Sequence, residues 1–335
     1  MKIGLTYDLR DEYRRLGYGE EETAEFDSLE TIQGIESALE SLGYQTDRIG
    51  HIGALTARLA AGERWDLAFN IAEGLNGLGR EAQVPALLDA FRIPYTFSDP
   101  VALALTLHKG MAKHVVRDLG IPTPDFAVVH DDFELEGMRL PLPLFVKPVA
   151  GGSSMGISPA AKICELESLL PACRELWTRF GQPVLVESFL EGREYTVGVV
   201  GTGSGTKALG VMEILLQPEA EPEVYSYANK RDYQTRVCYR LANGGLAERA
   251  TDLALKVWKG LGCRDAGRVD LRCDSRGELN FLEVNPLAGL HPEHSDLVIL
   301  CRLLGIGYQQ LIRIVMESVE ERLRADLKAA PVAIP

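Results

Sequence analysis

Residues 267–286 read Gly-Arg-Val-Asp-Leu-Arg-Cys-Asp-Ser-Arg-Gly-Glu-Leu-Asn-Phe-Leu-Glu-Val-Asn-Pro, the pattern of two alternating strands around a turn. Side chains two apart on a strand share a face, so Arg268 lies beside Asp270 and Glu283 beside Asn285. Two carboxylates and an amide oxygen are ligands that suit Mg²⁺, which also binds substrate phosphates. The stretch therefore predicts a hard-oxygen site for a metal-nucleotide.

The turn sets how the two strands pair. Asp274-Ser275-Arg276-Gly277 is a turn signal, and a four-residue turn pairs residue 273 with residue 278. This register places all four polar side chains on the same side of the hairpin. The alternative for this segment alone is an exposed sheet face with ordinary salt bridges.

The composition limits the classes to which the protein can belong. The chain has 335 residues, 46% of them hydrophobic and 25% charged, which is typical of a soluble globular protein with two or three cores. A net charge of −13 argues against nucleic acid or an anionic membrane as a partner, because both need clustered Lys and Arg. Six cysteines without Cys-x-x-Cys spacing favour reduced thiols, and the first seven residues read as a strand, not a signal peptide. We expect a cytoplasmic protein without a membrane span.

The first 99 residues alternate short apolar strands with helical stretches, which predicts a parallel α/β sheet. The strands are expected at 2–7, 44–48, 66–71 and 94–97. Ser98-Asp99-Pro100 then opens a helix through about residue 119, and a domain boundary is placed near 100–105.

The rest of the chain mixes strands and helices. Three strands, at 126–129, 143–147 and 184–189, flank a helix at about 165–180. Further strands, a helix at about 246–261, the hairpin and terminal helices follow. Residues 329–335 read as a loose tail.

A lysine at a strand end leads into a glycine- and serine-rich loop, Lys147-Pro-Val-Ala-Gly-Gly-Ser-Ser-Met-Gly156. Glycines let backbone N–H groups approach phosphate oxygens, and the lysine adds a point charge. A plain connection between strands is the alternative. The apolar strand 184–190 carries Glu187, which suits a hinge that reads an adenine edge, or alternatively a solvated charge at a strand end.

Taken in order, the loop, the hinge and the hairpin resemble those of an ATP-grasp carboxylate–amine ligase of the D-alanine–D-alanine ligase family. The resemblance covers about residues 1–325. It implies an α/β ATP-grasp fold, in which an N-terminal parallel α/β domain (1–104) precedes two α+β lobes (105–192 and 193–328) that clamp the nucleotide. It also implies amino acids as small-molecule substrates, ATP and two Mg²⁺ or Mn²⁺ ions as cofactors, and a homodimer.

The resemblance assigns roles to individual residues. Arg268, the backbone of Gly289, Ser154, Glu25 and Lys230 are implied to be catalytic, Lys230 reaching the γ-phosphate from a mobile flap. The residues implied to bind ATP are Lys109, Lys147, Gly152, Ser153, Glu187, Leu190, Glu194 and Leu282. The implied metal ligands are Asp270, Glu283 and Asn285.

The amino-acid pockets depart from the family pattern. Glu25 matches the glutamate that holds the first substrate's ammonium, although an exposed acid is equally compatible. Glu73 stands where the family carries a histidine, and Arg231 where a flap tyrosine closes over the first substrate. His294 and Ser295 resemble the pair beside the second substrate's carboxylate, with one extra residue before them. These departures put D-alanine itself in doubt.

The sequence thus predicts an ATP-dependent ligase that joins two amino acids through an acyl phosphate. The first alternative is a peptide or natural-product ligase of the same superfamily that uses another amino acid or carboxylate. The second is a nucleotide-binding regulatory module that has lost catalysis.

Overall fold

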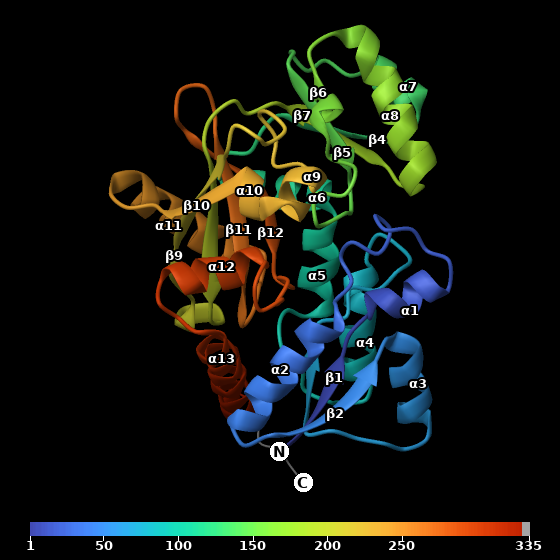
Figure 1. Ribbon diagram of the computed structural model, residues 1–335, viewed down its shortest axis with the longest axis vertical. Coiled ribbons are helices and arrows are strands. Elements are labelled where there is room, and N and C mark those ends of the chain that lie inside the picture. The colour runs from blue at the N-terminus through green and yellow to red at the C-terminus, as the bar shows by residue number, and fades with distance from the viewer. Residues whose placement is uncertain (330–335) are drawn as a thin grey trace.

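The computed structural model describes residues 1–329, in which three separate sheets stack along the long axis of the molecule (Figure 1). The N-terminal sheet lies at the bottom of the figure, the four-stranded sheet at the top and the five-stranded sheet on the left. One sheet falls in each of the three segments that the sequence predicts as domains, whose exact limits stay a prediction. Of the loose tail predicted at 329–335, Ala329 still belongs to the last helix, and residues 330–335 lie outside the described residues.

The N-terminal sheet is parallel, with the order β2-β1-β3, as the alternating pattern predicts. A fourth strand at 94–97 was expected and is wrong, because Tyr95 forms only an isolated bridge with Ala68. The elements are β1 (Lys2–Thr6), α1 (Arg10–Arg15), α2 (Leu29–Ser41), β2 (Gln45–Gly50), α3 (Ile52–Ala60), β3 (Leu67–Asn70) and α4 (Gln83–Ala90).

The helix expected from residue 100 to 119 is broken into α5 (Pro100–Leu107) and α6 (Lys109–Asp118). His108 has non-helical backbone angles and caps α6 by accepting a hydrogen bond from the N–H of Met111. The N–H of Lys109 then donates to the carbonyl of Val149 instead of to its own helix. The break therefore ties the start of α6 to the glycine-rich loop.

The four-stranded sheet is antiparallel, with the order β4-β7-β5-β6, and α8 packs on it. Its predicted strands and helix are found within one or two residues of the expected limits. The elements are β4 (Phe126–Val129), α7 (Asp132–Glu136), β5 (Leu144–Pro148), β6 (Lys162–Ile163), α8 (Leu166–Phe180) and β7 (Val184–Ser188).

The five-stranded sheet is also antiparallel, with the order β10-β9-β8-β11-β12. Helix α11 buries Trp258 and its small neighbours against one face of this sheet. The elements are β8 (Glu194–Val200), β9 (Lys207–Leu216), α9 (Tyr227–Arg231), α10 (Tyr233–Arg236), β10 (Val237–Leu241), α11 (Gly245–Gly260), β11 (Ala266–Cys273), β12 (Leu279–Asn285), α12 (Asp296–Leu303) and α13 (Tyr308–Ala329).

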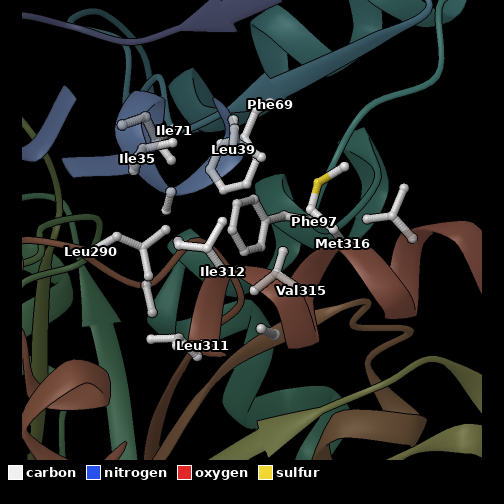
Figure 2. Packing of buried hydrophobic residues seen from close by; sticks show 14 of the residues in the cluster. Ile35, Leu39, Phe69, Ile71, Phe97, Leu290, Leu311, Ile312, Val315 and Met316 are labelled. Atoms are coloured by element: carbon white, nitrogen blue, oxygen red, sulfur yellow. The ribbon is translucent and has the colours of Figure 1, made fainter. Parts of the chain in front are cut away.

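The last helix joins the two ends of the chain in one core. Figure 2 shows Ile312 and Val315 of α13 packed against Leu39 of α2 and against Phe69 and Phe97. The last two rings meet edge to face with centroids 5.6 Å apart, a favoured aromatic geometry. Because burial of each such side chain stabilises by about 1.5–3 kcal/mol, α13 holds the N-terminal sheet beside the five-stranded sheet.

Among residues 1–329, no single helix is long and apolar enough to cross a membrane. The pair formed by 296–303 and 308–326, bent by 109°, passes that test on length and composition alone. All six cysteines are unpaired, and four of them are buried.

Candidate active site

The hairpin has a different register from the expected one. Cys273 pairs with Leu279 instead of residue 278, so the turn is one residue longer than predicted. A bulge at Leu282 then shifts the pairing by one more residue, so that Asp270 faces Glu283. The two shifts add up to two residues, which is one full period of the side-chain alternation. The prediction that the polar side chains share one face is therefore confirmed.

These side chains contact one another. The amide nitrogen of Asn285 lies 3.2 Å from a carboxylate oxygen of Asp270 and 3.4 Å from one of Glu283. Arg268 forms an ion pair with Asp270, whose other oxygen accepts a hydrogen bond from Thr196. Rotation of the amide turns its oxygen towards the carboxylates, so the donor set fits a hard cation such as Mg²⁺.

Three lysines surround these carboxylates. Lys109 lies 3.2 Å from Glu283, and both Lys113 and Lys147 bind the buried carboxylate of Glu187, at 2.8 and 2.7 Å. Burial raises the pKa of Glu187, but the two ammonium groups outweigh it and lower the pKa to about 2. Burial likewise raises the pKa of Glu283, and Lys109 and Lys147 hold it below its ordinary value. The lysines thus keep both carboxylates charged.

Two adjoining cavities meet at this cluster. We call them the acid-rich cavity, which reaches Glu25 and Glu81, and the hinge cavity, which reaches Glu187. Nineteen of the twenty predicted site residues line one or both cavities, and Arg231 lies outside them. Five residues line both: Ser153, Lys230, Arg268, Glu283 and Asp296.

The hinge cavity combines apolar walls with charged groups at its end. Glu194 lines it and is bound by Arg272 at 3.3 Å, while Lys147 lies at the end of β5 as predicted. Leu282 reaches the cavity because it occupies the bulge. The apolar wall is formed by Phe145, Ile157, Phe189, Leu190, Ile214, Val224 and Leu282. Such a wall suits a flat aromatic ring such as adenine.

The glycine-rich loop is fixed by residues of the N-terminal segment. Gly152 donates its N–H to Glu25 at 2.6 Å, and a Cβ at this position would lie only 2.5 Å from the same carboxylate. Only glycine therefore permits this approach. Ser153 and Ser154 both have left-handed backbone angles, and the hydroxyl of Ser154 donates to the carbonyl of Tyr225. The loop is thereby tied to the segment that carries Lys230.

Lys230 lies on the short helix α9 and points into both cavities. Its ammonium group lies 3.0 Å from Asp296, a buried carboxylate at the first position of α12. Asp296 also accepts a hydrogen bond from Tyr225 and lies 3.8 Å from Arg268. Burial raises the pKa of Asp296, but Lys230 and Arg268 lower it overall. One carboxylate thus aligns two of the predicted catalytic cations.

Glu25 lies in the acid-rich cavity but is not a free acid. Arg80 binds its carboxylate at 2.5 Å, and each of these two side chains is only 7% exposed. Glu73 and Glu81 line the same end of the cavity. Burial and the charges of Glu81 and Glu25 raise the pKa of Glu73 well above its ordinary value. Burial raises the pKa of Glu81 to about 8, against the opposing charge of Arg80.

The two departures at Glu73 and Arg231 do not meet. Arg231 is exposed and binds its neighbour Asp232 at 2.9 Å, so it does not pair with Glu73. The ring of His294 stacks on that of His291 with centroids 3.6 Å apart. Burial, His291 and Arg10 lower the pKa of His294 to about 4. The hydroxyl of Ser295 accepts the N–H of His291 at 2.9 Å.

Sequence reasoning missed Lys113, Asp296, Arg80 and Glu81. Lys113 follows Lys109 by four residues and so shares its helix face, which was an available signal. Asp296 looks like an ordinary acid in the first turn of a helix. Arg80 and Glu81 were missed because a short charged segment gives no sign of burial.

Comparisons with known proteins identify the family of the chain. A family model described as the D-ala D-ala ligase C-terminus matches residues 115–317. The D-alanine–D-alanine ligase of Bordetella avium is 32% identical over 334 residues, which cover 98% of each chain.

Solved structures share the fold. The D-alanine–D-alanine ligase of Bacillus anthracis, complexed with ATP, aligns with a TM-score of 0.72 and 21% identity over 97% of this chain and 99% of that one. The VanG D-Ala:D-Ser ligase of Enterococcus faecalis aligns with a TM-score of 0.72 and 21% identity over 95% and 99%. By its sequence and by its fold, the chain belongs to the D-alanine–D-alanine ligase family of ATP-grasp proteins.

Proposed function

We propose that this protein is an ATP-dependent ligase that joins two amino acids and converts ATP to ADP and phosphate. The observation that carries the proposal is the cluster of Arg268, Asp270, Glu283 and Asn285 at the point where the two cavities meet. A nucleotide in one cavity and amino acids in the other would meet at this cluster. The assignment of residues 1–104, 105–192 and 193–328 to three domains is part of the proposal.

The hinge cavity is the proposed nucleotide site. Its apolar wall takes the adenine ring, Glu194 takes a ribose hydroxyl, and Lys109 and Lys147 contact phosphates. Asp270, Glu283 and Asn285 would hold two Mg²⁺ ions, or Mn²⁺ in their place, and these ions would neutralise phosphate charge. Catalysis of this kind depends on positioning and charge neutralisation and needs no protein nucleophile.

The reaction proceeds in two steps. A carboxylate oxygen of the first amino acid forms a bond to the γ-phosphorus, and the bond from that phosphorus to ADP breaks. The amine nitrogen of the second amino acid then attacks the acyl carbon, phosphate leaves with the carbon–oxygen bond electrons, and the nitrogen releases a proton. Arg268 and the backbone N–H of Gly289 face the oxygen that becomes negative in the second step, where one such donor contributes about 3 kcal/mol.

A second candidate within the family uses an amino acid other than D-alanine in the first step. The half-buried carboxylate of Glu73 and the buried carboxylate of Glu81 favour it, because a small apolar side chain gives them no partner. A regulatory module without catalysis is disfavoured by the intact cluster at Arg268.

Release of phosphate tests the proposal. The protein is incubated with ATP, Mg²⁺ and single or paired amino acids of both configurations, and the products are identified by mass spectrometry. We expect phosphate release that depends on an amino acid and on Mg²⁺, together with a dipeptide. Absence of release with every amino acid, from protein that binds ATP, would favour the regulatory module.

Assembly and cellular setting also belong to the proposal. We propose a homodimer, as the family resemblance implies, and light scattering of the purified protein tests it. A cytoplasmic location is proposed because all six cysteines are free thiols, four of them buried.

A further inference from the structure

With its carboxylates ionised, the acid-rich cavity would carry more negative charge at one end than a simple amino acid can neutralise. Three carboxylates, those of Glu25, Glu73 and Glu81, lie at this end with one guanidinium, that of Arg80. When all are ionised, the group carries two negative charges in excess. The α-ammonium of a substrate accounts for one of them.

Glu25 is already satisfied without a substrate. One of its oxygens accepts from Arg80 at 2.5 Å and the other from the N–H of Gly152 at 2.6 Å. Arg80 also donates to the carbonyl of Ala150, so its guanidinium is held in place. The pair of Glu25 and Arg80 is therefore neutral, and the excess charge resides on the other two carboxylates.

Glu81 has no protein partner although it is buried. Glu81 is 9% exposed, and its carboxylate forms no hydrogen bond and no ion pair within residues 1–329. The carboxylate of Glu73, which is only half-buried, likewise forms no hydrogen bond and no ion pair in the described part of the chain. Lys109, the cation besides Arg80 that acts on Glu81, is bound to Glu283. A buried carboxylate without a partner costs several kcal/mol, so it needs a ligand or a proton.

Nearby charges do not supply that partner. Arg10 donates its guanidinium hydrogens to the backbone carbonyls of Thr23, Ala24 and Phe26. Lys230 is bound to Asp296.

We propose that Glu73 and Glu81 form a cation-binding pair, and that the first substrate is a diamino acid whose second amino group binds to this pair. The proposal rests on the proposed function, because it names the substrate of that same site. The diamino acid would bring two ammonium groups to an end of the cavity that lacks two positive charges. Its carboxylate would remain free for phosphorylation near Arg268.

Matched amino acids test the proposal on the unmodified protein. The compounds are 2,4-diaminobutyrate and 2-aminobutyrate, which have the same carbon chain and differ in the terminal amine, each in both configurations. Phosphate release with ATP and Mg²⁺ should give a kcat/KM for the diamino acid at least ~10-fold higher, since a site built for a polar group rejects the analogue that lacks it. Equal values, or a preference for 2-aminobutyrate, would overturn it.

Substitutions locate the effect. Glu81→Gln and Glu73→Gln should each reduce the preference by about ten-fold or abolish it, because the second ammonium loses a charged acceptor. Glu167→Gln, at an exposed position of α8, is the matched control and should keep the preference. A preference that survives in both cavity variants would contradict the assignment to this pair.

Calorimetry separates this inference from the proposed function. Binding of each compound is measured without ATP or metal, so the result does not depend on turnover. If no amino acid causes phosphate release, the proposed function is wrong, and calorimetry still decides whether Glu73 and Glu81 bind the second amino group. This binding role stands if 2,4-diaminobutyrate binds at least ~10-fold more tightly than 2-aminobutyrate, and it fails if the two bind equally or neither binds.

Discussion

The ammonium nitrogen of Lys113 lies 2.8 Å from the carboxylate of Glu187, and both side chains are buried, at 0% and 3% exposure. Lys147 binds the other oxygen of the same carboxylate at 2.7 Å. Lys113 also donates to Thr123 and to the carbonyl of Phe281 in β12. This lysine therefore links α6, the hinge strand β7 and the hairpin that carries the predicted metal ligands.

Removal of either partner should destabilise the fold, by different amounts. Lys113→Met leaves Glu187 with Lys147 and should lower the free energy of unfolding by about 1–3 kcal/mol. Glu187→Gln leaves two buried ammonium groups without a counter-charge and should cost more, about 3–5 kcal/mol. Urea unfolding measures both, and Arg174→Met, which breaks the exposed pair with Asp132, should leave the stability nearly unchanged. The reverse order of the two large effects would contradict this account.

Acid should reduce the contribution of Lys113 to stability. The pKa of Glu187 is about 2 in the folded chain and near 4.5 in the unfolded chain. Between these values the unfolded chain binds the proton and the folded chain does not, so stability falls as the pH falls. In Lys113→Met the pKa of Glu187 rises towards its ordinary value. The stability gap between the native protein and this variant should therefore be full above about pH 5 and narrow towards pH 3. A gap that stays constant from pH 6 to pH 3 would refute the assignment.

The flap should loosen when Asp296 loses its charge. In Asp296→Asn the amide keeps the side-chain volume but no longer pairs with Lys230 or Arg268, so α9 loses its ionic anchor on α12. We expect proteolytic cleavage within 217–236 to become at least several-fold faster, because cleavage follows local opening. Glu248→Gln, in the first turn of α11, is a control for helix N-terminal charge and should leave cleavage unchanged. Equal cleavage rates for all three proteins would exclude an anchoring role.

The amino-acid pattern was sufficient for the architecture because periodicity reports burial. The parallel sheet, the antiparallel strands and most helices follow from apolar spacing that each segment carries by itself. The break at His108 could not be predicted this way, since it depends on a hydrogen bond from Lys109 to Val149, forty residues along the chain. The sequence likewise gives no sign of the bulge at Leu282.

The same distinction, between local pattern and contacts far along the chain, applies to the residues of the site. Residues in motifs of fixed spacing, such as Arg268 and Asp270, were found because the spacing itself brings them together. Lys113 and Asp296 were missed because each is an ordinary helix residue until an element far along the chain packs against it. The role of Arg231 towards a substrate stays a prediction, since no pattern shows whether a flap residue points inwards.

Loss of one carboxylate should disable the predicted metal site. Glu283→Gln keeps the side-chain volume but removes a charged ligand and the partner of Lys109, so we expect turnover to be lost while the circular dichroism spectrum stays that of the native protein. Phosphate release at several Mg²⁺ concentrations measures the effect. Near-normal activity of this variant at ordinary Mg²⁺ would overturn the assignment of Glu283 as a ligand.

Arg268 should act on the transition state more than on the binding of ATP. It is held by Asp270 and lies 3.8 Å from Asp296, so its guanidinium is oriented before any substrate binds. A pre-oriented charge contributes most where negative charge appears during the reaction, and we expect Arg268→Met to lower kcat by at least ~100-fold with little change in the Kd of ATP. Arg272→Met is the contrasting variant on the same strand: Arg272 binds Glu194 in the hinge cavity, so its loss should weaken ATP binding and lower kcat much less. Single-turnover kinetics and nucleotide titration separate the two effects. If Arg268→Met instead loses ATP affinity and retains kcat, Arg268 is a nucleotide contact, and the oxyanion role must pass to the backbone of Gly289 alone.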